Sequence, residues 1–318
     1  MKKLLALLLL AATPLFANPF LVCPAVTSGV SNSPVTYTVS GLPNSPIVSN
    51  AVTITSGTVQ LDLDLGPAGQ NVPSGSYTVS ATATNPNGTS AASANFGLTI
   101  AANQALALSG SGQYLSVSNG IVSAYPYSFV CWVKIASLPS ANSALISLGS
   151  TSTSNEYTEL YVSTTGAVGG WSDDTNGGVG AITTATMSTG AWHLAVAVFS
   201  SATSRTVYLD GANAASNTTS RTPTGFNASG LGVVFTGTGT AHSLLTGSIA
   251  YCTIYNVALT STDVTNLWNS GSGVAPNTIE SSNVVSYSPF QGSSPWADGV
   301  STNTWTTTGS PTTGTAPF

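Results

Sequence analysis

Two strand-like runs stand out between residues 190 and 211 of this 318-residue chain. Residues 192–199 form an almost unbroken apolar run, which is typical of a strand buried on both of its faces. Residues 206–209 alternate polar and apolar side chains, and the Asp210-Gly211 pair that follows tolerates the positive φ of a tight turn. The stretch therefore predicts a β-hairpin with a further turn at its exit.

Residues 18–100 show alternation in shorter strands. Apolar and polar residues alternate over 35–39, 59–65 and 77–83, and an Asn-Pro-Asn-Gly turn follows at 85–88. Strands spaced about 8–12 residues apart, with Pro, Gly and Asn between them, are the signal of a β-sandwich. A separate small sandwich is therefore predicted for this part of the chain.

The second part of the chain, residues 101–275, begins with a short linker of small residues. Strands are predicted at 127–135, 143–148 and 157–162. One helix is predicted after residue 260, because Thr260 or Ser261 can cap its start, three apolar residues between 264 and 268 share one side, and Gly271 can end it. The abundance of Thr and Val favours an all-β fold for the rest.

Residues 276–318 are rich in Ser, Thr, Pro and Gly, yet they are not uniformly polar. The apolar stretch 284–290, Trp296 and Trp305 can dock as extra strands on the preceding domain. A disordered stalk is the alternative interpretation.

The first 17 residues have the order of a secretory signal peptide. Lys2-Lys3 precede a Leu/Ala run over 4–12, and a small-residue cleavage site ends at Ala17. The run is too short to span a bilayer, so no membrane span is expected after cleavage, and the mature chain is predicted to be secreted or displayed at the cell surface. A buried N-terminal helix is the alternative.

Composition then excludes one class of partner. Only 5% of the residues are charged, and removal of the leader leaves Lys134, Arg205 and Arg221 as the basic residues against ten acidic ones. A chain so poor in cations cannot neutralise many phosphates, so nucleic acid is not expected as a partner. Arg205 and Arg221 flank the predicted hairpin and are expected to be surface charges.

Four motifs in order resemble a known family: YSFVCWVK at 127–134, Trp-His at 192–193, VYLDG at 207–211, and a strand at 247–259 that ends in IYNVAL. They resemble the laminin G-like, or concanavalin A-like lectin/glucanase, jelly-roll family. The resemblance implies a β jelly roll over 101–275. Residues 18–100 resemble bacterial immunoglobulin-like modules, which implies an N-terminal immunoglobulin-like β-sandwich.

The resemblance also bears on the cysteines and on calcium. In the resembled fold the strands that hold Cys131 and Cys252 can lie side by side, which allows a disulfide between them; two buried free thiols are the alternative. The state of Cys23 stays open. Many relatives carry a calcium-binding acidic residue just after the Ile of the 247–256 strand, where this chain has Ala250-Tyr251, a departure that argues against calcium of the family type.

Two segments supply candidate binding residues. Alternation places Tyr157, Glu159 and Tyr161 on one side of their strand, where two rings and a carboxylate suit a sugar. The glycine-rich stretch 169–178 is expected to be a mobile loop, and the candidate ligand-binding residues within it are Trp171, Asp173, Asp174 and Asn176.

Each candidate has a plain structural alternative. Tyr157 and Tyr161 can be cross-strand partners on a half-exposed sheet face. Asp and Asn are ordinary turn formers, and Trp171 can cap the core. Asp173 and Asp174 are also the candidate ligands for Ca²⁺, the one cofactor that the sequence suggests.

No catalytic motif accompanies these residues. Retaining glycoside hydrolysis needs paired carboxylates, and alternation places Glu156 and Glu159 on opposite faces of one strand. His193 has no nucleophile and acid motif beside it. The sequence therefore predicts a secreted, non-catalytic module, not an enzyme, that recognises a carbohydrate or cell-surface ligand through jelly-roll loops. The alternative is a structural or adhesive surface protein that acts through contacts with extracellular protein.

Overall fold

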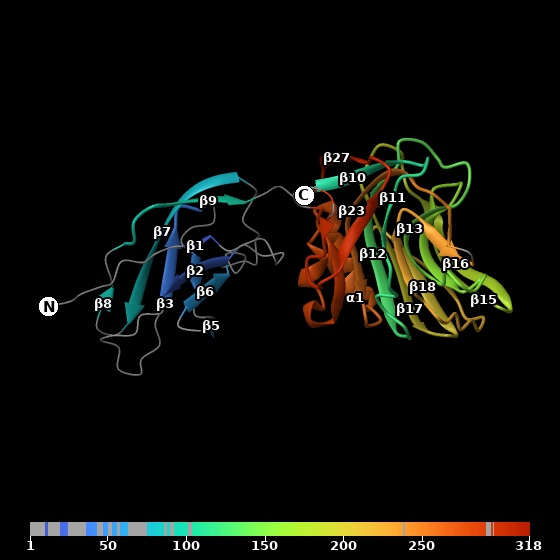
Figure 1. The fold of residues 1–318 in the computed structure, drawn as a ribbon, viewed down its shortest axis with the longest axis horizontal. Coiled ribbons are helices and arrows are strands. Elements are labelled where there is room, and N and C mark those ends of the chain that lie inside the picture. Colours follow the sequence, from blue (N-terminus) through green and yellow to red (C-terminus); the bar gives the residue numbers. More distant parts are fainter. Residues whose placement is uncertain are drawn as a thin grey trace. The chain divides into compact units, whose positions relative to one another are not determined.

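The computed structural model describes residues 104–318 except 238, 291–293 and 295, and shorter segments of the preceding part (Figure 1). Those shorter segments are 10–11, 20–24, 36–42, 47–49, 53–55, 58–62, 75–85, 88–89 and 92–100. The chain divides into two compact units, Met1–Ala102 and Asn103–Phe318.

The first unit contains two antiparallel sheets. One has the order β1-β2-β6-β5, and the other has the order β4-β3-β7-β8 with β9 paired to β7. Their bounds are β1 Leu10–Ala11, β2 Phe20–Pro24, β3 Thr36–Ser40, β4 Ile47–Ser49, β5 Thr53–Thr55, β6 Thr58–Asp62, β7 Gly75–Asn85, β8 Gly88–Thr89 and β9 Phe96–Ile100.

In the described parts of β3 and β7, the buried residues Val39, Val79 and Ala81 alternate with more exposed neighbours, as predicted for these two stretches. Its assignment as an immunoglobulin-like module stays a prediction. The predicted signal peptide lies outside the described residues apart from β1, and secretion is likewise untested. Cys23 lies in β2.

The second unit is a sandwich of two antiparallel sheets (Figure 1). The first sheet has the order β19-β18-β17-β12-β23-β10-β27, with β24 paired to β23. Its bounds are β10 Gln104–Ser109, β12 Tyr127–Lys134, β17 His193–Ser201, β18 Ser204–Leu209, β19 Ala212–Asn217, β23 Thr246–Tyr255, β24 Val284–Ser288 and β27 Thr312–Thr315.

The second sheet has the order β16-β15-β14-β13-β20-β11-β26-β25. Its bounds are β11 Tyr114–Val117, β13 Ser143–Gly149, β14 Tyr157–Val162, β15 Ala167–Asp174, β16 Gly177–Thr186, β20 Ala228–Leu231, β25 Trp296–Ala297 and β26 Thr304–Thr308. A small hairpin of β21 (Val234–Thr236) and β22 (Thr240–His242) accompanies it.

The core lies between the two sheets. Phe129 of β12 and Phe199 of β17 meet edge to face with ring centroids 5.4 Å apart, and both are fully buried. Leu160 of the second sheet belongs to the same cluster. Cys131 and Cys252 are joined as a disulfide between the neighbouring strands β12 and β23.

The predicted hairpin is present as β17 and β18, and the turn at its exit leads into β19. Asp210 and Gly211 have φ values of 54° and 75°, which is the positive-φ pair that a tight two-residue turn requires.

The predicted helix is α1, Ser261–Trp268. Thr260 caps it and forms a capping box with Asp263, while Asn269 adopts the left-handed conformation at its end. The helix therefore ends before Gly271, the residue at which the sequence predicted its end. Leu267 is buried, and Trp268 stacks on Trp132 of β12. No helix among the described residues is both long and apolar enough to cross a membrane.

The C-terminal extension contributes strands to both sheets. β24 pairs with β23 and β27 pairs with β10 in the first sheet, while β26 pairs with β11 in the second. Trp305 of β26 is fully buried in the core cluster. A free stalk is thus not what the described residues of this extension form.

We predict that Trp305→Ala lowers the free energy of unfolding by about 3–5 kcal/mol, because it removes a large side chain from a packed core. Chemical denaturation of the full chain measures this. Leu138→Ala is the control, since Leu138 is 50% exposed and should change stability by no more than about 0.5 kcal/mol. Equal effects of the two substitutions would contradict the docked extension.

Candidate functional site

The outer face of β14 and β15 brings together five of the residues singled out in the sequence. In the register of this pair, Tyr157 lies opposite Asp173 and Glu159 opposite Trp171. Alternation turns Leu160 to the other face, where it is buried in the core. The outer-face cluster consists of Tyr157, Glu159, Tyr161, Trp171 and Asp173.

Two aromatic rings of the cluster lie across glycines of the neighbouring strands. The indole of Trp171 occupies the space that a Cβ of Gly178 or Gly180 would need, and the ring of Tyr161 does the same at Gly169. Glycine in a strand normally weakens it and often marks a close approach. Here the missing side chains let both rings lie flat on the sheet.

Three of the five side chains of the cluster are partly accessible, whereas Tyr161 and Glu159 are buried at 5% and 6% exposure. The side chains of Tyr157, Trp171 and Asp173 are half-buried, and Ile182 of β16, opposite Gly169 in the register, is 45% exposed. The outer face therefore presents apolar ring surface beside polar groups.

Glu159 is the buried acid of the cluster. It is only 6% exposed, and its Oε2 has no hydrogen-bond partner among the described residues. Burial, followed by the charge of Asp173, raises the pKa of Glu159 to about 8. Burial also raises the pKa of Asp173, against the opposing effect of nearby Trp171 and Tyr157. The sequence does not indicate this pair of carboxyl groups, because the two residues come from different strands and only the strand register brings them to one face.

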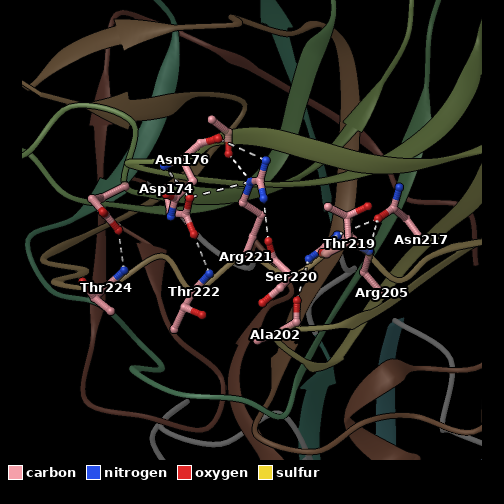
Figure 2. Close-up of polar contacts among 12 residues, drawn as sticks. Asp174, Asn176, Ala202, Arg205, Asn217, Thr219, Ser220, Arg221, Thr222 and Thr224 are labelled. Carbon is pink, nitrogen blue, oxygen red and sulfur yellow. Dashed lines mark hydrogen bonds and ion pairs between the residues drawn. The ribbon is translucent and has the colours of Figure 1, made fainter.

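Asp174 and Asn176 are not part of this face. Asp174 accepts the N–H of Asn176 through Oδ1 and the N–H of Thr222 through Oδ2, both at 2.8 Å, and lies 3.7 Å from the Nε of Arg221 (Figure 2). Although burial opposes it, these N–H donors lower the pKa of Asp174. The prediction of a mobile loop at 169–178 is wrong, because these residues form the end of β15, a tight turn and the start of β16.

Both arginines fasten the chain that follows β19. Arg221 donates to the carbonyls of Gly177 and Asn176 (Figure 2). Arg205 is 1% exposed and donates to the carbonyls of Thr219 and Ala202 at 2.9 and 3.0 Å. The expectation of two surface charges is therefore wrong for Arg205, which is buried without a carboxylate partner among the described residues.

The two candidate calcium ligands do not converge. Asp173 and Asp174 are adjacent in β15 and therefore point to opposite faces of the sheet. In the described part of the chain, no three His, Cys, Asp or Glu side chains are grouped so that they could hold a metal ion. The carboxyl pair that shares a face is Glu159 and Asp173.

His193 has partners that the sequence analysis missed. Its Nδ1 lies 2.7 Å from Oδ2 of Asp210, and its Nε2 lies 2.9 Å from the hydroxyl of Ser188. The backbone N–H of Ser188 also donates to Nε2, at 3.1 Å, which places the ring proton on Nδ1. Because a backbone donor already occupies the lone pair a general base would use, this arrangement serves to hold the chain between Ser188 and His193.

A groove beside α1 is another candidate surface among the described residues. Asp210, Trp268, Val274 and Ile279 are among its lining residues. None of its lining side chains is a buried polar group without a partner among the described residues. The outer-face cluster, which has such a group in Glu159, therefore carries more of the chemistry of recognition.

Two antiparallel sheets packed face to face, with the candidate residues on the outside of one sheet, define a β-sandwich of the jelly-roll class. Residues 109–265, which lie in the second unit, match the family model of the concanavalin A-like lectin/glucanases superfamily. No curated protein sequence matches the chain.

Several solved structures resemble the chain at low identity. A heptameric SAP-like pentraxin from Limulus polyphemus is 13% identical with a TM-score of 0.44, over 52% of this chain and 82% of that one. The CBM40 of a Ruminococcus gnavus IT-sialidase, bound to α2,3-sialyllactose, is 16% identical with a TM-score of 0.42, over 52% and 94%. Domain 4 of a GH43 extracellular arabinanase from Geobacillus stearothermophilus, in complex with arabinotriose, is 18% identical with a TM-score of 0.41, over 72% and 86%.

We predict that Asp174→Ala lowers the free energy of unfolding by about 1–3 kcal/mol, because it removes the charged acceptor of two partly buried N–H donors. Amide hydrogen exchange at Thr222 should accelerate as well. Asp173→Ala is the matched control, since its side chain faces the other way and should leave the Thr222 amide protected. Unchanged exchange at Thr222 in Asp174→Ala would contradict the hydrogen bond from the Thr222 N–H to Asp174.

The raised pKa of Glu159 predicts how stability depends on pH. The fold favours the neutral carboxyl, so its contribution is fully present below the ordinary value of 4.5 and is lost as the pH rises through about 8. Glu159→Gln keeps the shape without the charge. We expect it to match the unsubstituted protein near pH 4 and to be more stable by roughly 2–4 kcal/mol near pH 9.

Chemical denaturation across this pH range measures the difference. Glu280→Gln makes the same change at an exposed position and should show no such trend. A stability difference for Glu159→Gln that is constant with pH would contradict the assignment.

Proposed function

We propose that the jelly roll of this chain binds carbohydrate through the outer-face cluster. The observation that carries the proposal is the arrangement of Trp171, whose half-buried indole lies over Gly178 and Gly180, with the unpartnered, buried oxygen of Glu159 on the same face. This combination of flat apolar surface and oriented polar groups is what binding sites for small polar ligands share.

The chemistry of a sugar complements each half of the cluster. A pyranose ring has one face lined with C–H groups, and burying that face against the exposed side of an aromatic ring removes apolar area from water. Its hydroxyl groups can donate to Oε2 of Glu159 and Oδ1 of Asp173, neither of which has a partner among the described residues. An unsatisfied buried acceptor gains most from a new donor.

The same proposal takes the chain to be a secreted, non-catalytic binding module. The leader pattern of residues 1–17 supports export. The site differs from the predicted jelly-roll loops in one respect: it is on strands, which hold side chains more rigidly than loops do.

We predict that the full chain binds at least one glycan on a glycan array, and that Trp171→Ala weakens this binding at least tenfold because the stacking surface is lost. Trp192→Ala is the matched control: Trp192 is also half-buried but lies next to Lys134, at the start of β17 in the other sheet. Its removal should leave binding unchanged.

Further arms of the same experiment separate the alternatives. Loss of sugar binding with a chelator would show a role for Ca²⁺, and release of reducing sugar from a bound glycan would overturn the non-catalytic reading. Absence of binding to any glycan, combined with self-association of the chain, would contradict the proposal and favour a structural or adhesive protein.

A further inference from the structure

The charged groups of the outer-face cluster are both acidic. Glu159 of β14 and Asp173 of β15 are brought to one face by the strand register. Burial raises the pKa of Tyr157 and of Tyr161, and the nearby charge of Glu159 raises both pKa values further. Asp173 brings negative charge to the cluster, whereas Glu159, whose pKa is raised to about 8, ionises when a cation binds beside it. None of the five cluster residues is basic.

Arg221, the cation whose charge acts on Asp173, makes its hydrogen bonds to other groups. Arg221 acts on Asp173 only weakly, because its guanidinium donates to the carbonyls of Gly177, Asn176 and Ser220 and lies near Asp174 (Figure 2). The side chain that could neutralise the outer-face acids instead fastens the chain on the other side of the β15–β16 turn.

Each of the two acids has one carboxylate oxygen that no described residue hydrogen-bonds. Oε2 of Glu159 and Oδ1 of Asp173 are buried atoms without a hydrogen-bond partner among the described residues, and the Glu159 side chain as a whole is 94% removed from solvent, with 6% exposed. A carboxylate oxygen in such a place is best compensated by a charged donor, whose hydrogen bonds are shorter and stronger than neutral ones.

The aromatic rings favour the same kind of ligand. A cation above the face of Trp or Tyr is attracted by the ring quadrupole, most strongly for Trp. Trp171 lies opposite Glu159 in the register and two residues from Asp173 on its own strand, so one compact group can meet its ring and a carboxylate at once. A tetrahedral ammonium group with three donors has the size and charge for this position.

We propose that the outer-face cluster selects sugars that carry a free ammonium group, that is, hexosamine units without an N-acetyl group, with the ammonium placed between Glu159 and Asp173 beside Trp171. The proposal rests on the carbohydrate-binding function above and adds the class of sugar. An N-acetyl group would replace the cation by a larger neutral amide, and a carboxylated sugar would be repelled by both acids.

Electrostatics of the free site points in the same direction. Burial and the charge of Asp173 make ionised Glu159 unfavourable in the empty site, and a bound cation opposes both effects. A neutral sugar hydroxyl offers a hydrogen bond but no charge. An ammonium can therefore stabilise the ionised carboxyl that the empty site disfavours, which a neutral hydroxyl does not do.

Isothermal titration calorimetry on the full chain tests the proposal. The probes are a glucosamine tetrasaccharide, the N-acetylglucosamine tetrasaccharide of the same length, and a uronic acid oligosaccharide. Each is titrated at pH 7, where part of the amines is protonated and Glu159 is within about one unit of its raised pKa of about 8. We expect the glucosamine tetrasaccharide to bind at least tenfold more tightly than its N-acetylated counterpart, and the uronic acid oligosaccharide to bind more weakly than either.

Glu159→Gln and Asp173→Asn test the position of the ammonium. Each keeps the side-chain shape, and each should reduce the preference for the glucosamine probe severalfold while changing affinity for the N-acetylated probe less. Glu280→Gln removes an exposed acid elsewhere and should leave the preference intact. Two variants are used so that the test survives if one of them fails to fold.

The outcomes distinguish this inference from the function on which it rests. Trp171-dependent binding of neutral sugars without an ammonium preference would overturn the inference and leave the proposed function standing. A preference that persists in both variants would place the ammonium elsewhere and also overturn it. Absence of binding to every probe and every other glycan would contradict the proposed function itself.

Discussion

The packing of one sheet against the other is the constraint on which the rest of the jelly roll depends. Gly170 of β15 lies where a side chain would collide with Val207 and Ala197 of the opposite sheet, so the two layers approach closely at this point. Slipping β15 by one residue would exchange its inner and outer faces and drive Trp171 into the core. The close contact inside therefore determines which side chains the molecule presents outside.

The polar residues near the β15–β16 hairpin fall into two groups. Asp174, Arg205 and Arg221 direct their polar atoms at backbone groups and hold the segment after β19 in place. Glu159 and Asp173 retain acceptors that the described chain does not use. Folding stability accounts for the first group, because buried polar groups are normally paired. The second group is a cost to the fold, and such costs persist mainly where a site requires them.

Alternation alone predicted much of this architecture. It located the β17–β18 hairpin and gave the shared face of Tyr157, Glu159 and Tyr161, because a strand has a strict two-residue period. The family motifs then indicated the jelly roll. The Asp210-Gly211 turn was predictable from its own two residues, since positive φ is a local property.

What could not be read from the sequence depends on contacts between distant segments. The glycine-rich segment 169–178 has the composition of a loop. Its glycines instead make room in the strands for the rings of Tyr161 and Trp171. Asp174 accepts a hydrogen bond from the backbone N–H of Thr222, which lies 48 positions away in the sequence. The buried guanidinium of Arg205 donates to the carbonyls of Ala202 and Thr219, which come before and after it in the chain. Local patterns give periodicity; they do not give the partners that decide whether a polar residue pairs with distant backbone groups or retains an acceptor that the described chain does not use. That distinction separates Asp173 from Asp174, two adjacent and chemically identical residues whose roles differ because the sheet turns one outward and the other toward Arg221.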